Sequence, residues 1–241
     1  MRVTSAQVPA DRTRERLCLA LDVPDLASAR SLAKSLRPWF AVVKVGLELY
    51  VAEGPAAVAA FIEDGFDVFV DLKLHDIPTT VQRAARAIAR TGARYATVHA
   101  AGGGAMLAAA AEGFAEGAAA AGQTSPTVGL AVTVLTSDAD ATPALVVARS
   151  VLAARSGCGG VICAVADVAS IRAAVPGMIT VVPGVRPAGT SRDDQSRVGT
   201  PQDALLAGAD LLVLGRAITR AKDPMAAARD LAGSLHSLAS P

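Results

Sequence analysis

The stretch GFDVFVDLKLHDIPTT, residues 65–80, decides the fold of this chain. Its first part, residues 66–73, is mostly apolar and rich in β-branched and aromatic residues, which is typical of a buried strand. Polar and helix-breaking residues follow, and a helical pattern then runs over residues 79–91. A buried strand followed by a helix is the repeating unit of a parallel sheet covered by helices. The stretch therefore predicts one βα unit.

The same unit recurs on both sides of this stretch. Apolar runs that predict strands lie at residues 17–22, 40–46, 66–73, 94–100, 128–135, 159–165, 178–184 and 210–215. Helical patterns lie at residues 26–36, 55–64, 79–91, 104–121, 143–156, 167–175, 201–207 and 224–238. Eight such units are the composition of a (β/α)8 barrel, whereas doubly wound sheets more often have about five to seven strands. We therefore predict an α/β protein that is a single-domain (β/α)8 TIM barrel.

The length leaves no room for a second domain. The 241 residues are close to the roughly 250 that such a barrel needs, and a hydrophobic content of 52% supplies a full core. We assign residues 17–241 to the barrel and expect residues 1–16 to form a flexible leader. The polar segment 184–200 follows the seventh strand, where we predict a lid loop.

Composition also excludes several classes of function. A net charge of +1 and an aromatic content of 3% leave neither a basic stripe nor stacking platforms for nucleic acid. The uncharged stretch 117–137 contains a turn in its middle, so we expect no membrane span. The N-terminus has no apolar core of a signal peptide, which predicts a cytoplasmic protein. Cys18, Cys158 and Cys163 lack metal-ligand spacing, so we predict buried free thiols and no metal site.

Charged residues fall at the ends of the predicted strands, where a barrel places its active site. Asp71 and Lys73 are two residues apart in the third strand, so both side chains should point to one face. Lys44, at the end of the second strand, and the nearby Asp76 complete a candidate alternating-charge array. A structural ion-pair network is the alternative, but buried ion pairs contribute little net stability, which favours a role in function.

The array suggests a type of chemistry. A lysine held between carboxylates stays cationic and oriented, so it can deliver a proton to a carbon that becomes negative in the transition state. A neighbouring carboxylate would repel an anionic substrate carboxylate. These properties suit replacement of a carboxylate by hydrogen, with Lys73 as proton donor and no organic cofactor, although other proton transfers remain open.

Two arginines predict an anion site. Arg186 follows the seventh strand, and Gly215 and Arg216 follow the eighth. The loops after these two strands of a barrel frequently hold a phosphate, through backbone N–H groups, a helix N-terminus and cationic side chains. A phosphorylated small-molecule substrate is therefore expected.

The segment DLKLHDIPTT, residues 71–80, resembles the DxKxxDIPxT signature of the orotidine 5'-phosphate decarboxylase family. The similarity extends over nearly the whole chain beyond the first sixteen residues, through ALD (20–22), KVG (44–46), VHAAGG (98–103), VTVLTS (132–137), PGVRP (183–187), DQ (194–195) and GRAIT (215–219). The resemblance implies cofactor-independent decarboxylation of orotidine 5'-phosphate to UMP and CO2, the last step of de novo pyrimidine biosynthesis.

The resemblance also implies roles for individual residues. Asp22 would hold the ribose hydroxyls or the pyrimidine side, and Lys44 would hydrogen-bond the ribose and the array. Asp71 would crowd the substrate carboxylate, and Lys73 would protonate C6.

Two further groups are implied in the same way. Asp76 and Thr80 would reach into the site of a second subunit of a homodimer, and Ile77 between them would bind substrate. The remaining substrate contacts would be made to the pyrimidine and the phosphate, by Thr136, by the lid residue Gln195, and by Arg186, Gly215 and Arg216.

Two alternatives stay open. Sugar-phosphate decarboxylases and aldolases of the same barrel superfamily share a DxKxxD motif but use Mg²⁺, held by an acidic residue where this chain has Lys44. A cation at that position opposes metal binding. A non-catalytic nucleotide-binding barrel would keep Arg186 and Arg216 but would not need Asp71, Lys73 and Asp76 together.

Overall fold

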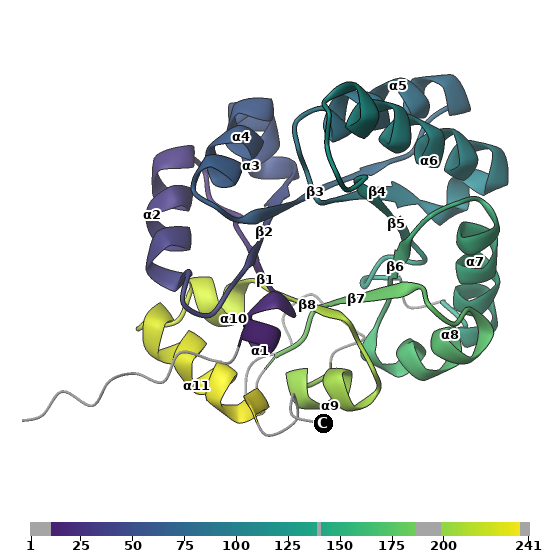
Figure 1. The fold of residues 1–241 in the computed structure, drawn as a ribbon. Coiled ribbons are helices and arrows are strands. Elements are labelled where there is room, and N and C mark those ends of the chain that lie inside the picture. The colour runs from purple at the N-terminus through teal and green to yellow at the C-terminus, as the bar shows by residue number, and fades with distance from the viewer. Residues whose placement is uncertain (1–10, 139–140, 187–198, 237–241) are drawn as a thin grey trace, which may run out of the picture.

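A computed structural model describes residues 11–138, 141–186 and 199–236. Eight parallel strands close into a barrel in the order β1 to β8, with β1 hydrogen-bonded to β8 (Figure 1). The strands are Leu17–Ala20, Val42–Gly46, Asp67–Leu74, Tyr95–His99, Val128–Val132, Gly160–Ile162, Ile179–Pro183 and Leu211–Leu214. The predicted (β/α)8 barrel is confirmed, and each predicted range contains its strand except the third, where β3 extends one residue beyond the predicted end at 73.

Helices surround the barrel. Those that the sequence predicts are α2 (Leu26–Leu36), α4 (Pro55–Glu63), α5 (Pro78–Ala89), α6 (Gly103–Ala120), α7 (Pro143–Arg155), α8 (Val168–Ala174), α9 (Pro201–Leu206) and α11 (Pro224–His236). Short elements that it does not predict are α1 (Asp11–Glu15), α3 (Leu47–Glu53), α10 (Arg216–Thr219), and the 3₁₀ turns η1 (Ala100–Gly102) and η2 (Val165–Asp167). These pieces have one or two turns, too few for a helical period to show in a sequence.

Part of the expected leader is structured. Helix α1 precedes β1 and lies at the amino-terminal end of the strands: the Arg14 carbonyl accepts a 3.2 Å hydrogen bond from the Ala41 amide, and the Arg16 carbonyl accepts one of 2.9 Å from Leu212. Thr13, within α1, is buried. These bonds attach residues before the predicted boundary at 17 to the barrel.

Apolar side chains fill the interior of the barrel and the layer between strands and helices. The inner cluster comprises Cys18, Ala20, Val42, Phe69, Leu130, Val132, Ile162, Val181, Leu211 and Val213. All three cysteines are buried free thiols, as predicted. Burial raises the pKa of Cys158 to about 12.

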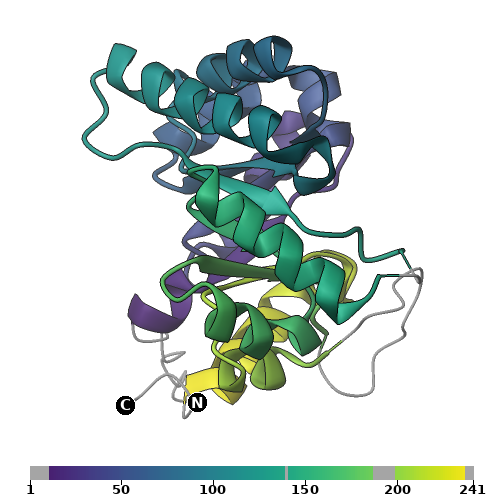
Figure 2. The ribbon, with the colours of Figure 1, turned by 90° about the vertical axis from the view of Figure 1, so that its right-hand side faces the viewer.

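Helices α5 and α6 lie side by side on the outside of the barrel (Figure 2). A Cβ added at Gly113 would lie 2.2 Å from the Gln82 carbonyl oxygen, and one at Gly117 would lie 2.3 Å from that of Arg86. Glycine is therefore needed at both positions for this close approach.

Among the described residues, no helix is long and apolar enough to cross a membrane, and the uncharged stretch 117–137 includes the end of α6, a turn and β5.

Candidate active site

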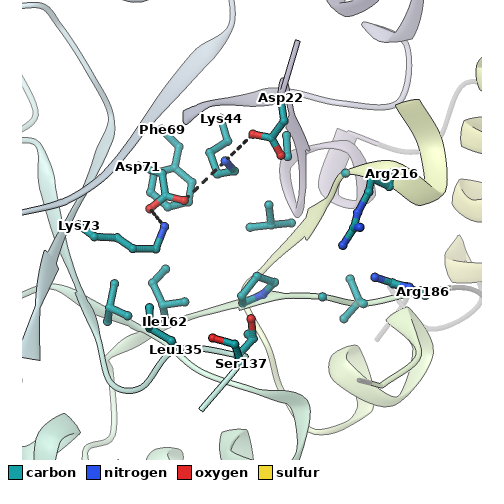
Figure 3. Close-up of a pocket in the computed structure, with 18 of the residues that line it drawn as sticks. Asp22, Lys44, Phe69, Asp71, Lys73, Leu135, Ser137, Ile162, Arg186 and Arg216 are labelled. Carbon is teal, nitrogen blue, oxygen red and sulfur yellow. Dashed lines mark hydrogen bonds and ion pairs between the residues drawn. The ribbon is translucent and has the colours of Figure 1, made fainter. Parts of the chain in front are cut away.

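Four charged residues form a continuous chain at the carboxyl ends of the first three strands (Figure 3). Lys44 Nζ lies 3.3 Å from Asp22 Oδ1 and 3.5 Å from Asp71 Oδ2. Lys73 Nζ lies 2.9 Å from the other oxygen of Asp71, Oδ1. We call Asp22, Lys44, Asp71 and Lys73 the charged chain. Its signs alternate, so each ammonium has a carboxylate neighbour.

Burial differs along the charged chain. The side chains of Lys44 and Asp71 are 11% and 14% exposed, whereas those of Lys73 and Asp22 are 36% and 57% exposed. The two central groups are therefore shielded from water, and the two outer groups face the cavity and solvent. Gly46 leaves room for the Lys44–Asp22 pair, because a Cβ there would lie 2.8 Å from Lys44 Nζ and 3.0 Å from Asp22 Oδ1 and would require the pair to shift.

The central pair is held in its ionised form. Burial alone would lower the pKa of Lys44, but the negative charges of Asp71 and Asp22 outweigh it and raise that pKa. Burial would raise the pKa of Asp71, yet Lys44, Lys73 and the hydrogen bonds from Lys73 and Thr97 lower it. The site thus keeps the Asp71 carboxylate ionised although its side chain is largely shielded from water.

Asp71 and Lys73 do meet, as predicted, but β3 is not a regular strand where they lie. Its register against β4 shifts between Val70 and Leu74, and Lys73 has φ +51°, the one positive φ among the described non-glycine residues. A left-handed conformation costs a side-chain-bearing residue about 1–2 kcal/mol. Strain of this kind at a charged residue in a barrel mouth is typical of a functional site.

Sequence reasoning missed Thr97 of β4. Its hydroxyl donates a 3.0 Å hydrogen bond to Asp71 Oδ1 and accepts one of 2.8 Å from the Lys73 amide. Thr97 is 1% exposed, and a polar residue inside a buried strand is the signal that could have drawn attention to it.

A cavity of about 430 Å³ opens beside the charged chain. Lys73 and Asp71 line one end, and Arg186 and Arg216 lie together at the opposite side, after β7 and β8 (Figure 3). The predicted residue Thr136 lines the cavity with its neighbour Ser137, which the sequence analysis did not single out. The other lining residues are mostly apolar or glycine: Ala20, Phe69, Val132, Val134, Leu135, Ile162, Pro183, Gly184, Val185, Val213, Gly215 and Ala217.

The cavity thus has the Asp71–Lys73 ion pair at one end and two arginines at the other. The sequence profile of the orotidine 5'-phosphate decarboxylase / HUMPS family matches residues 15–231. The chain belongs to this family. An orotidine 5'-phosphate decarboxylase of Anaeromyxobacter sp. (strain K) is 50% identical over 232 residues, covering 92% of this chain and 98% of the relative. One from Moorella thermoacetica is 49% identical over 234 residues, covering 92% of each.

Solved structures agree with the sequence comparison. The crystal structure of orotidine 5'-phosphate decarboxylase from Lactobacillus acidophilus matches with a TM-score of 0.75 and 31% identity, covering 90% of this chain and 97% of that one. That from Pyrococcus horikoshii OT3 also has a TM-score of 0.75, with 26% identity and coverage of 91% and 98%.

Three residues of the family signature lie outside the cavity of their own chain. Asp76, Ile77 and Thr80 are exposed at the start of α5, and none of them lines the cavity. The Ile77 side chain is prominent, because the residue is 67% exposed. Asp76 Oδ1 accepts a 2.6 Å hydrogen bond from the Ile77 amide, which fixes the turn that presents them. Within one chain Asp76 therefore stands apart from Lys44, Asp71 and Lys73.

The predicted lid falls mostly outside the described residues. Gln195 is one of the residues that the structure does not describe, whereas Arg186 at the start of the segment and Gly199 near its end are described. The Arg186 amide donates a 3.1 Å hydrogen bond to the Gly199 carbonyl. The two ends of the predicted lid are thus joined at the cationic side of the cavity.

The described part of the chain contains no group of three or more His, Cys, Asp and Glu residues that could hold a metal ion. The two carboxylates nearest the cavity, Asp22 and Asp71, both lie within ion-pair distance of Lys44. The Lys44 ammonium therefore lies between the carboxylates of Asp22 and Asp71, and carboxylate oxygens are the ligands that a divalent cation such as Mg²⁺ prefers.

Proposed function

We propose that this protein decarboxylates orotidine 5'-phosphate to UMP and CO2, without an organic cofactor or metal, as the last step of de novo pyrimidine biosynthesis. The observation that carries the proposal is the Asp71–Lys73 pair facing a cavity whose opposite side holds Arg186 and Arg216. Curated relatives that are about half identical over nearly the whole chain bear the name of this activity.

The charged chain would perform the chemistry. Lys44 and Asp22 would hold the ribose, and Asp71 would lie beside the substrate carboxylate. When the bond from C6 to the carboxylate breaks, its electron pair stays on C6 and CO2 departs. Lys73 then gives C6 a proton from its ammonium group, and the neutral amine regains a proton from water. Asp71 would repel the leaving carboxylate and orient the Lys73 ammonium, whose positive charge stabilises the carbanion.

The cationic side would bind the phosphate. Arg186, Gly215 and Arg216 line the cavity, and the short helix α10 begins at Arg216. Guanidinium groups bind phosphate oxygens through charge-assisted, often bidentate hydrogen bonds. This grip lies remote from C6, so its binding energy would serve to place the pyrimidine ring against Lys73. Thr136 would contact the pyrimidine, and Gln195 of the lid would bridge the base and the phosphate.

We further propose that the active unit is a cytoplasmic homodimer in which Asp76, Ile77 and Thr80 complete the partner's site. Their exposure, and their position outside the cavity of their own chain, support this arrangement. Leu47 and Val51 of α3 are 56% and 81% exposed, which supplies apolar surface for a subunit contact. No nucleic acid or membrane partner is proposed.

The test is to follow the loss of orotidine 5'-phosphate absorbance in metal-free buffer containing EDTA. The proposal requires turnover that EDTA does not change. A Mg²⁺-dependent sugar-phosphate activity with no turnover of orotidine 5'-phosphate would favour the metal-dependent members of the superfamily instead. Binding of UMP with no turnover of either substrate would indicate a non-catalytic nucleotide-binding barrel.

A further inference from the structure

The ladder between β3 and β4 contains a mismatch at the charged chain. Val70 pairs with Ala96 and Leu74 pairs with Val98, so the three residues between them in β3 stand opposite Thr97 alone. A bulge of this kind leaves backbone groups without a ladder partner and changes the direction of a side chain. Lys73, with φ +51°, lies inside it.

The Thr97 hydroxyl takes the place of the missing ladder partner. It accepts the Lys73 amide hydrogen at 2.8 Å, and its own hydrogen goes to Asp71 Oδ1 at 3.0 Å. That same oxygen accepts from Lys73 Nζ at 2.9 Å. A hydroxyl has a single hydrogen to donate, so its one donor is used and one of its lone pairs accepts.

We infer that Thr97 is a positioning residue for the proton transfer, holding the left-handed backbone of Lys73 and one oxygen of Asp71 with a single hydroxyl. Thr97 does not line the cavity, so it acts through these two residues rather than on the substrate. The inference rests on the proposed function for its effect on catalysis. Its effect on the Lys73 backbone is independent of that function.

Valine at this position would keep the shape of threonine but remove both hydrogen bonds. The Lys73 amide would lose its acceptor, and the Asp71 carboxylate would lose one of its donors and the orientation that this donor imposes. Misplacement of a reacting group by about 1 Å can cost on the order of 100-fold in rate. The phosphate contacts of Arg186 and Arg216 would be untouched, so the loss should appear in kcat rather than in ligand binding.

The experiment compares Thr97→Val, Thr97→Ser and a control, Thr127→Val, in the full-length protein. Thr127 is 5% exposed and donates a 2.7 Å hydrogen bond to the Ala93 carbonyl at the other end of the barrel. We expect Thr97→Val to lower kcat about 10- to 100-fold, which is the range for a hydrogen bond to a charged group. The dissociation constant of UMP should change by less than about threefold. Thr97→Ser should recover most of kcat, and Thr127→Val should leave it near that of the wild type.

The pH profile gives a readout that a merely structural role would not move. The Thr97 hydrogen bond contributes to lowering the pKa of Asp71. Its removal should therefore raise that pKa, and the acidic limb of kcat against pH should shift to higher pH in Thr97→Val only. An acidic limb that stays in place, with kcat equal in Thr97→Val and Thr127→Val, would overturn the inference.

Hydrogen–deuterium exchange at the peptide covering residues 71–74 tests the backbone contact without any turnover. The Lys73 amide should exchange faster in Thr97→Val than in the wild type or in Thr127→Val. Unchanged exchange would contradict the inference even in a protein with full activity, whereas faster exchange in a protein without activity would contradict only the proposed function. If Thr97→Val does not fold, Thr97→Cys supplies a similar volume with a weaker donor and is expected to show the same effects to a smaller degree.

Discussion

Lys73 Nζ lies 2.9 Å from Asp71 Oδ1, although the backbone between the two residues departs from regular strand geometry. Alternation in a flat strand would place both side chains on one face but would not by itself bring the two charges into contact. The left-handed turn at Lys73 and the bulge against β4 accompany that contact. The ion pair between Lys73 and Asp71 is therefore formed at a local irregularity of the barrel.

Replacement of the proposed donor should separate chemistry from binding. We expect Lys73→Ala to lower kcat by about 100-fold or more, the range for loss of a general acid, while the dissociation constant of UMP changes little. Lys34→Ala is the matched control, because Lys34 forms an ion pair with Asp64 on the outer surface, 3.2 Å away. Near wild-type turnover of Lys73→Ala would contradict the donor assignment.

The shared site can be tested with hybrid dimers. Mixing equal amounts of Lys73→Ala and Asp76→Asn subunits should produce heterodimers in which one of the two sites has both Lys73 and Asp76. With random exchange, about half of the dimers are hybrids, and each hybrid has one complete site out of two. About one quarter of all sites should therefore be active, which predicts about one quarter of the wild-type activity. Recovery is measured as orotidine 5'-phosphate turnover after exchange has been verified by mass. Exchange without recovery would argue against a contribution of Asp76 across subunits.

The phosphate assignment predicts a substrate-dependent effect. Arg216→Ala should lower kcat/KM for orotidine 5'-phosphate about 10- to 100-fold, because a charge-assisted contact is lost. The same substitution should change little for orotidine, which lacks the phosphate. The measurement compares kcat/KM of the wild type and Arg216→Ala for both substrates. An equal loss of kcat/KM for orotidine 5'-phosphate and for orotidine would contradict a contact between Arg216 and the phosphate. Arg229→Ala, an exposed arginine on α11 beside Asp230, serves as the control.

A stability prediction concerns an ion pair far from the cavity. Hydrogen bonds from Arg30 hold the pKa of Asp64 at about 2, below its ordinary value of 3.8. A lowered pKa means that Asp64 adds stability above its unfolded-state pKa and loses this contribution as the pH falls through its folded-state pKa. Asp64→Asn should therefore reduce the free energy of unfolding at neutral pH, by about 1 kcal/mol or less for a pair at the surface. The difference from the wild type should vanish between pH 4 and 2.

Denaturant unfolding across this pH range measures the effect. Asp230→Asn provides the control, since that carboxylate is 74% exposed beside Arg229. If the free energies of unfolding of the wild type and Asp64→Asn differ by the same amount at pH 7 and at pH 2, the stabilisation does not depend on the Asp64 charge.

The sequence was sufficient for the barrel because apolar runs and helical patterns alternate along nearly the whole chain. It also placed Lys44, Asp71 and Lys73 together, since charges at the ends of adjacent parallel strands must meet at one edge. It could not show the bulge, because the left-handed Lys73 and the role of Thr97 arise from pairing between β3 and β4. Local pattern does not encode such a register shift.

The position of Asp76 is the second feature of the site that could not be predicted from the sequence pattern. Closeness in sequence grouped it with Lys73, but Asp76 and Ile77 are both exposed in the turn before α5, and neither lines the cavity. Their proposed role depends on a second subunit, which a pattern within one chain can indicate only through family resemblance.

The most direct test of the central claim is to incubate the wild-type protein with orotidine 5'-phosphate in D2O containing EDTA and to analyse the product by NMR. We predict UMP carrying deuterium at C6, formed at a rate that EDTA does not change and that Lys73→Ala lowers by about 100-fold or more. No UMP from the wild-type protein, or formation of UMP that requires added Mg²⁺, would contradict the claim.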